Sequence, residues 1–439
     1  MPTAERSSFK VIIVGGGLGG LGAAIGLARK GHKVTVLEAA PQLNEVGAGI
    51  QIPPNSSRVL AEYGLTEKFH KKAVWPRSII FRRYESGKVI GSTPLDPEMT
   101  EKYGYPYWLI HRADYLQLLY EGSQEVGVEV LLGSPVDYVD QAAPAVILND
   151  GRRYEADLVI GADGIRSRTR RAVIPSKEVE TNDSPNCAYR ATVPAALMNA
   201  DDDIKHLMID PNANCWIGHN HHIMAYPIRQ GELYNLVLSH PGKAAVGKWN
   251  EPGNLEEMKS HYANFDPIIQ KVLTLVGGCL KWKLADLPPL PNWVSAGGKV
   301  VLIGDAAHAM VPYLAQGAAA SIEDGAALAE CLDRAASTKD IPRVIRAFET
   351  IRKPRCERIQ SGALANGYIW HMPDGEEQIL RDKAMKQEMD KSEDRDPVSN
   401  PNQWSDDEFQ PWLFGHNAFD YTNQMLDVIL QQSRQKNQA

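Results

Sequence analysis

Short apolar stretches alternate with amphipathic ones in two separate parts of this 439-residue chain. The run over residues 10–38 reads as a strand, a glycine turn, a helix rich in Ala, Leu and Ile, and a second strand. Residues 299–328 repeat this order with an apolar strand, a loop and a helix that opens on glycine. Strands that alternate with helices are typical of an α/β domain with a parallel sheet.

The pattern changes to short extended runs between residues 181 and 286. These runs read NCAYRATVP, NCWIGHN, HHIMAYPIR and LYNLVLSH, and Gly, Pro and Asn separate them, as in an antiparallel sheet. We therefore expect an α/β domain in two parts with a sheet domain inserted. The predicted boundaries are 1–180 and 287–370 for the α/β domain, 181–286 for the sheet domain, with 75–105 as a further candidate for it, and 371–439 for a C-terminal helical region.

Within that C-terminal region, the polar stretch DKSEDRDPVSNPNQWSDDE predicts an exposed loop.

Composition narrows the class of protein. A net charge of −7 and a pI near 6.0 leave no basic excess to bind nucleic acid or an anionic membrane. Five scattered cysteines without a CxxC pair predict a reducing compartment, and neither they nor the histidines show metal-ligand spacing. No apolar signal core or membrane-spanning segment stands out, so we expect a cytoplasmic protein with no bound metal.

The glycine turn after the first strand has the spacing of a dinucleotide-binding fingerprint. Gly15 permits the tight turn, Gly17 lets the backbone approach a pyrophosphate, and Gly20 lets the helix pack on the strand. Glu38 ends the second strand, where a ribose hydroxyl would lie. An acidic residue there favours an unphosphorylated ribose, as in FAD or NAD.

The segment after residue 299 suits a flavin. Asp305 follows the apolar strand, where its carboxylate could accept hydrogen bonds from ribityl hydroxyls. Gln316, Gly317 and Ala318 then open a helix whose unpaired N–H groups and positive dipole end would face the flavin N1–C2=O edge, where negative charge gathers on reduction.

Three motifs together resemble one family. They are GGGLGGLGAA with Glu38, DLVIGADGIRSRTRR at 157–171, and GDAAHAMVPYLAQGAAASIEDG. The chain resembles the class A FAD-dependent aromatic hydroxylases, especially the fungal salicylate hydroxylase-like monooxygenases. The resemblance implies an α/β fold: a Rossmann-like FAD-binding domain of the p-hydroxybenzoate hydroxylase (PHBH) type, an inserted, mostly antiparallel substrate sheet, and C-terminal helices.

The resemblance also implies further cofactor residues. Asp163 lies in the Asp-Gly motif that serves FAD and the reducing nicotinamide in this family. Gly49 belongs to the matching segment GAGIQIPPNS, and Arg112, in HRADYLQLL, would lie by the ribityl chain. Pro312 lies in the flavin loop. A surface ion pair is the alternative role for Arg112.

The implied reaction is hydroxylation of a phenolic or aromatic-acid substrate through a flavin C4a-hydroperoxide, with NADH or NADPH and O₂ as co-substrates. Only one dinucleotide fingerprint is present, so the nicotinamide would visit transiently. Arg190 matches a position that faces the substrate in the family. His222 and Tyr226 match positions that deprotonate or orient the phenol, and their spacing places both on one face of a strand. His221 should face the opposite side, toward solvent.

Other interpretations remain open. Arg190 could form a structural ion pair, and His222 and Tyr226 could be packed side chains with satisfied hydrogen bonds. The enzyme could instead epoxidise or hydroxylate a larger fused aromatic, polyketide or indole alkaloid in fungal secondary metabolism. A flavin-free, non-catalytic protein of the same fold is a third option. We expect a small-molecule aromatic partner, and a homodimer is compatible with the sequence.

Overall fold

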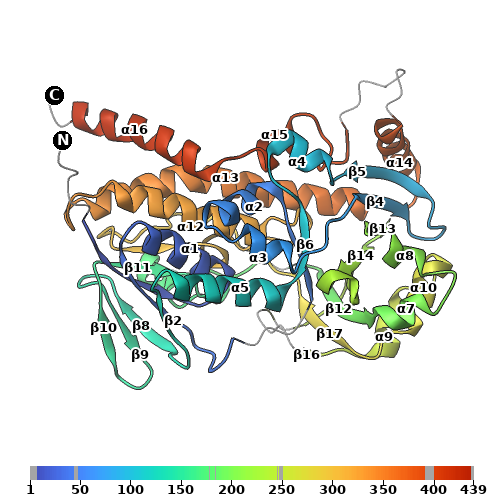
Figure 1. Cartoon of the computed structure of the whole chain (residues 1–439), viewed down its shortest axis with the longest axis horizontal. Coiled ribbons are helices and arrows are strands. Elements are labelled where there is room, and N and C mark those ends of the chain that lie inside the picture. The colour runs from blue at the N-terminus through green and yellow to red at the C-terminus, as the bar shows by residue number, and fades with distance from the viewer. Residues whose placement is uncertain are drawn as a thin grey trace.

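The computed structural model describes residues 7–43, 48–176, 178–182, 184–244, 246, 251–390 and 400–436. A parallel sheet lies at the centre of the nucleotide lobe (Figure 1). Its order is β18 (Val300–Leu302), β11 (Leu158–Gly161), β1 (Lys10–Val14), β2 (Lys33–Leu37) and β7 (Glu129–Leu131). The inner strands are almost wholly apolar because they are buried on both faces.

Helices cover this sheet, and the loops that lead into α1 and α12 contribute to the candidate site. Helix α1 packs against both α12 and α5, and α12 packs against α13 and α16. The bounds are α1 (Leu18–Arg29), α5 (Arg112–Glu125), α12 (Gly317–Asp333), α13 (Ile341–Trp370) and α16 (Ala418–Lys436). A small antiparallel sheet extends from the same lobe as β8 (Val136–Asp140), β9 (Ala145–Leu148) and β10 (Arg153–Glu155).

A second sheet forms the other lobe (Figure 1). Among the described residues it has eight strands, in the order β16 (Glu251–Pro252), β17 (Cys279–Lys283), β12 (Asn186–Pro194), β15 (Leu233–Pro241), β14 (His221–Ile228), β13 (Ala213–Gly218), β4 (Ser78–Arg83) and β5 (Val89–Pro94). All neighbours pair antiparallel except β13 and β4, which pair parallel. Residues 75–105 thus contribute two strands to this sheet. The α/β fold class with an inserted, mostly antiparallel sheet is confirmed.

The two faces of this sheet pack against different partners. On one face lie Arg190, Val237 and Met224, which are cross-strand neighbours. The other face, with Leu236 and Ile223, forms a separate apolar core with four short helices. These helices are α7 (Ala195–Asn199), α8 (His206–Ile209), α9 (Leu255–His261) and α10 (Pro267–Thr274). Because side chains alternate along a strand, one sheet can serve both the site and its own core.

The remaining elements connect the lobes and complete the surface. They are β3 (Gly49–Ile52), which pairs with β6 (Trp108–His111), α2 (Pro54–Glu62), α3 (Thr66–His70), α4 (Glu98–Tyr103), α6 (Arg170–Val173), the 3₁₀ turn η1 (Arg229–Gly231), α11 (Asp305–His308), α14 (Glu376–Met389) and α15 (Phe409–Phe414). Within the described ranges, no helix is both long and apolar enough to span a bilayer.

The predicted C-terminal loop departs in part from expectation. Residues 391–399 lie outside the described residues. Trp404, in the described remainder of that stretch, is only 2% exposed and packs against Phe81 and Trp370. The prediction of an exposed loop is therefore wrong at Trp404, because this aromatic side chain closes the apolar core beneath β4.

Candidate active site

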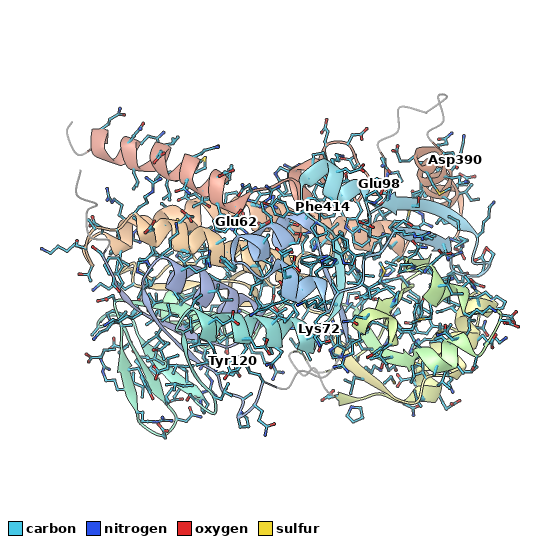
Figure 2. All side chains as sticks on the ribbon, in the orientation of Figure 1. Glu62, Lys72, Glu98, Tyr120, Asp390 and Phe414 are labelled. Atoms are coloured by element: carbon cyan, nitrogen blue, oxygen red, sulfur yellow. The ribbon has the colours of Figure 1, made fainter. Side chains whose placement is uncertain are left out.

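Side chains fill most of the space between the helices and strands (Figure 2). The candidate site is therefore sought in the cavities that remain between them. A cavity of about 280 Å³ lies between the nucleotide lobe and the eight-stranded sheet. A second cavity, of about 380 Å³, shares Gly17 and Ala162 with the first. Its walls include Gly15, Glu38 and Asp163. The two cavities therefore adjoin at the glycine turn, as one groove that could hold an extended dinucleotide.

The glycines of this turn are required by the space around them. Gly15 has a φ of +106°, and a Cβ atom there would lie 2.4 Å from the Ala162 carbonyl oxygen. A Cβ atom at Gly20 would lie 2.0 Å from the carbonyl oxygen of Gly15. At Gly17 a Cβ atom would meet no protein atom within 4 Å and would instead enter the groove. The turn thus leaves room for a pyrophosphate.

Glu38 and Asp163 are both held in place by backbone N–H groups. The Glu38 carboxylate accepts hydrogen bonds from the Gly16 and Ala40 N–H groups, at 2.6 and 2.8 Å. Asp163 accepts from the N–H groups of Arg168 and Thr169, at 2.8 and 3.0 Å, so it ties together its own loop. Both carboxylates lie in the wall of the second cavity, where contact with FAD stays a prediction.

The predicted flavin loop lines the first cavity. Asp305, Pro312, Gln316, Gly317, Ala318 and Arg112 all contribute to its walls. Helix α12 begins at Gly317, so its first N–H groups lie beside the cavity. An anionic edge of a cofactor would be stabilised there by these donors and by the helix dipole.

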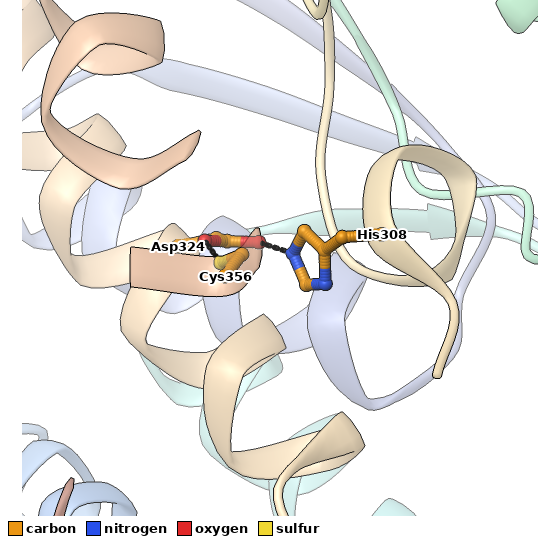
Figure 3. A group of neighbouring side chains, drawn as sticks. All are labelled: His308, Asp324 and Cys356. Carbon is orange, nitrogen blue, oxygen red and sulfur yellow. Dashed lines mark hydrogen bonds and ion pairs between the residues drawn. The ribbon is translucent and has the colours of Figure 1, made fainter. Parts of the chain in front are cut away.

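A cluster of buried polar and charged side chains contacts the start of this loop. Figure 3 shows three of its members, His308, Asp324 and Cys356. Asp324 accepts from His308 Nε2 at 2.6 Å and from the Gly304 N–H at 3.0 Å, and Arg352 Nε lies 2.9 Å from its other oxygen. Cys356 Sγ is 3.9 Å from the same carboxylate. Although burial opposes the charged form, Cys356 and Asp324 raise the pKa of His308 well above its usual value. His308, Asp324 and Cys356 lie close enough to hold a metal ion, but Arg352 already supplies the positive charge there.

Arg190 projects from β12 into the wall of the first cavity. Its guanidinium carbon lies 4.1 Å from the centre of the Trp282 ring, so the cation is stacked on an aromatic face. Trp282 and Val237 line the same cavity. Lys283 and Arg112 also line this cavity, so Arg190 is distinguished by its stacking on Trp282 and not by being a single cation.

Tyr226 lies beside this wall rather than in it. It is 2% exposed, and burial raises its pKa while Arg190 and Gln51 oppose that rise. A Cβ atom at Gly49 would lie 2.5 Å from the Tyr226 ring, so this glycine allows the close approach of the ring. Gly49 itself is absent from the walls of both cavities described above, and its cofactor role stays a prediction.

His222 points to the same face of the sheet, is 3% exposed and lines neither of the two cavities. Its Nδ1 lies 2.8 Å from His371 Nε2, and its ring packs against Tyr313 and Trp370. Burial, then His371, lower the pKa of His222 well below the usual value. The side chain is therefore neutral near pH 7, and the lowered pKa makes it a weaker base than an exposed imidazole.

His221 points to the other face, as expected, but not into solvent. It is half-buried and packs against His261 and Tyr262 from the segment that begins with helix α9. The prediction of a solvent-facing side chain is wrong because this segment covers that face of the sheet.

Sequence reasoning missed two residues of this region. Trp282 and Gln51 line the first cavity, and Gln51 accepts a hydrogen bond from the Tyr107 hydroxyl at 2.5 Å. Gln51 lies in the segment GIQIPPNS, where an isolated polar side chain in a buried strand was the available signal. The position of Trp282 depends on the pairing of β12 with β17, which local pattern does not reveal.

Comparison with known proteins places the chain in a family. The model described as "FAD binding domain" matches residues 8–363. The chain belongs to this family. An FAD-dependent monooxygenase, OpS4, from Beauveria bassiana (strain ARSEF 2860) is 37% identical over 415 residues, which cover 94% of this chain and 96% of that protein.

A further relative and a solved structure are also similar to this chain. A 3-hydroxybenzoate 6-hydroxylase from Polaromonas naphthalenivorans (strain CJ2) is 32% identical over 87% of this chain and 92% of that protein. The crystal structure of FqzB has a TM-score of 0.79 at 26% identity, over 99% of this chain and 96% of that chain. The chain is an FAD-dependent monooxygenase that uses FAD as cofactor and NAD(P)H and O₂ as co-substrates. The flavin-free alternative does not fit this family.

The residues present fit FAD. The glycine turn leaves a cradle that a Cβ atom would fill, the N-terminus of α12 borders the first cavity, and Gln316 brings a buried amide to the same wall. The second cavity would take the adenosine part beside Glu38, and the first would take the isoalloxazine beside Gln316 and Gly317.

Proposed function

We propose that this monooxygenase hydroxylates a phenol or an aromatic acid at the sheet-side wall of the first cavity. The observation that carries the proposal is the position of Arg190, a cation stacked on Trp282 in the wall that faces the flavin loop. A cation in an apolar and aromatic wall suits an aromatic ring that bears an anionic oxygen.

The side chains divide the work of preparing such a substrate. Arg190 would hold a phenolate or carboxylate oxygen, and Tyr226, beside Arg190 and Gln51, would orient the ring. His222 is neutral and a weak base, so it would orient the phenol as a hydrogen-bond acceptor. Val237, Trp282 and Pro312 would exclude water from the ring. Bound FAD would supply the electrons taken from NAD(P)H and the activation of O₂.

The names of relatives support an aromatic substrate. The Polaromonas relative acts on 3-hydroxybenzoate by name, and a Streptomyces cremeus relative that is 34% identical is named for 3-amino-4-hydroxybenzoate. Both substrates carry a phenol and a carboxylate, the two groups that Arg190 could bind as anions.

The test is NAD(P)H oxidation with a panel of phenols and aromatic acids, salicylate and 3-hydroxybenzoate included, with product analysis. We expect one class of phenol to accelerate flavin reduction and to yield a hydroxylated product. Arg190→Met should weaken binding of that phenol by about ten- to a hundred-fold, and Arg190→Lys by less, because a charged hydrogen bond is lost. If no phenol accelerates NAD(P)H oxidation or gives a product, the proposal is wrong.

A larger fused aromatic is the second candidate substrate. A further cavity of about 430 Å³ is lined by Asn186, Tyr313 and His371, and Asn186 lies four residues from Arg190 on β12, on the same face. Tyr313 Oη and Asn186 Nδ2 are 3.2 Å apart in the wall of this further cavity. The OpS4 relative comes from the fungus Beauveria bassiana. Product formed only from fused aromatics would favour this candidate.

We also propose a cytoplasmic location and a homodimer. All five cysteines are free and buried, which suits a reducing compartment. Light scattering of the purified protein tests the dimer, and fractionation of the producing cells tests the location.

A further inference from the structure

Three buried polar side chains form a hydrogen-bonded series that extends from the core to the flavin loop. It links Glu323 of α12, Asn55 of α2 and Gln316, which precedes α12. Glu323 and Asn55 are 0% exposed, and Gln316 is 1% exposed. Asn55 belongs to the segment GIQIPPNS but has no role in the proposed reaction. Buried polar groups in such a series need defined hydrogen-bond partners.

Glu323 is an ionised acceptor. Arg355 donates two hydrogen bonds to its carboxylate, from Nε to Oε2 and from Nη2 to Oε1, each at 2.8 Å. Arg352 Nη1 lies 2.8 Å from the same Oε2. Although burial opposes ionisation, Arg355 and Arg352 lower the pKa of Glu323 below its usual value. A carboxylate in this state accepts hydrogen bonds and donates none.

This charge fixes the orientation of two amides in turn. The Asn55 atom 2.6 Å from Glu323 Oε1 has to be Nδ2, because the carboxylate cannot donate. The same Nδ2 lies 3.0 Å from Gln316, which therefore presents its Oε1. Gln316 Nε2 must then point away from Asn55. This buried donor has no hydrogen-bond partner within the described part of the chain, and Gln316 lines the first cavity.

We propose that Asn55 is a positioning residue that keeps the Gln316 amide group turned so that Nε2 donates to bound FAD. A buried donor left without an acceptor is unfavourable, so a ligand that brings an acceptor to this wall is favoured. The isoalloxazine carries carbonyl oxygens and ring nitrogens that accept hydrogen bonds. Reduction adds negative charge to that ring system, so a fixed donor binds the reduced cofactor more tightly than the oxidised one and raises its midpoint potential.

The test is the midpoint potential of bound FAD in Asn55→Leu, Gln316→Leu and the double variant, measured without substrate. We expect each single variant to bind reduced FAD about ten-fold more weakly relative to oxidised FAD, which lowers a two-electron potential by about 30 mV. The double variant should have the potential of Gln316→Leu alone, because Asn55 acts only through Gln316. The dissociation constant of oxidised FAD should change less.

Ser57→Ala is the matched control. Ser57 lies two residues from Asn55 on the same helix and donates a 2.7 Å hydrogen bond to the Pro106 carbonyl oxygen, away from Gln316. This variant should keep the wild-type potential. If Asn55→Leu does not fold with FAD, Asn55→Ala replaces it in the same comparison. An unchanged potential in the Asn55 variant, or shifts that add in the double variant, would overturn the proposal.

Discussion

His308 carries a buried charge that should make stability depend on pH. Its pKa in the folded protein lies well above its usual value, so the folded protein keeps a proton that the unfolded chain loses above pH 6.5. The free energy of unfolding should therefore fall by about 1.4 kcal/mol per pH unit above that point, until the folded pKa is reached. Urea unfolding of the full chain at several values between pH 6.5 and 8.5 measures this slope.

The variant His308→Gln separates this slope from other titrations. It removes the titrating group and leaves Asp324 with Arg352 and the Gly304 N–H group. We expect a loss of about 3–5 kcal/mol at pH 6.5, because one member of a buried ion pair is gone. The variant should also have a flatter pH dependence than the wild type. Equal slopes in the two proteins would contradict a charged His308.

At the scale of single residues, local motifs were predictable and long-range partners were not. The walls of the two cavities include Gly15, Gly17 and Asp305. Each of these residues follows a strand by a few positions, so a local sequence pattern is enough to predict where it lies. The orientation of Gln316 depends on Asn55, which is 261 positions away. His222 contacts His371, which is 149 positions away. Neither partner can be identified from a periodic pattern.

At the scale of elements, the turn between β1 and α1 allows a matched pair of variants. Gly20→Ala should destabilise the FAD-free protein by about 1–3 kcal/mol, because the new Cβ atom overlaps the Gly15 carbonyl. Gly17→Ala should leave the FAD-free protein nearly as stable as the wild type, because its Cβ atom meets only the groove. It should nevertheless weaken FAD binding at least about ten-fold, by blocking close approach of the pyrophosphate.

Thermal unfolding without FAD and fluorescence titration with FAD distinguish the two effects. Wild-type FAD affinity in Gly17→Ala would show that the groove at this turn does not hold the cofactor. Gly20→Ala with unaltered stability would mean that the packing of α1 on β1 is looser than the structure has it.

Whole elements were predicted best where their pattern was local and long enough. The run NCAYRATVP is β12, and Gly317 begins α12, as the sequence indicated. The helices α7 to α10 were not predicted within 181–286. They have four to eight residues each, too few for a clear helical period. Their formation depends on packing against the sheet rather than on intrinsic helix propensity.

At the scale of the whole molecule, one face of the eight-stranded sheet borders the first cavity, and the other face packs against helices α7 to α10. Two neighbours on β15 test this division, because Leu236 is buried in the core with helices α7 to α10 and Val237 lines the first cavity. Leu236→Ala should cost about 2–5 kcal/mol of stability through the cavity it leaves. Its FAD potential and the fraction of NAD(P)H converted to hydrogen peroxide should stay at wild-type values.

Val237→Ala should show the opposite behaviour. Val237 is only partly buried, so we expect a stability loss of about 1 kcal/mol or less. Removing two methyl groups from the cavity wall should admit water beside the substrate and raise the yield of hydrogen peroxide per NAD(P)H consumed. Thermal unfolding and peroxide assays on both variants make the comparison. If Leu236→Ala raised peroxide release as much as Val237→Ala, the two faces would be coupled, and the sheet would transmit changes in its core to the site.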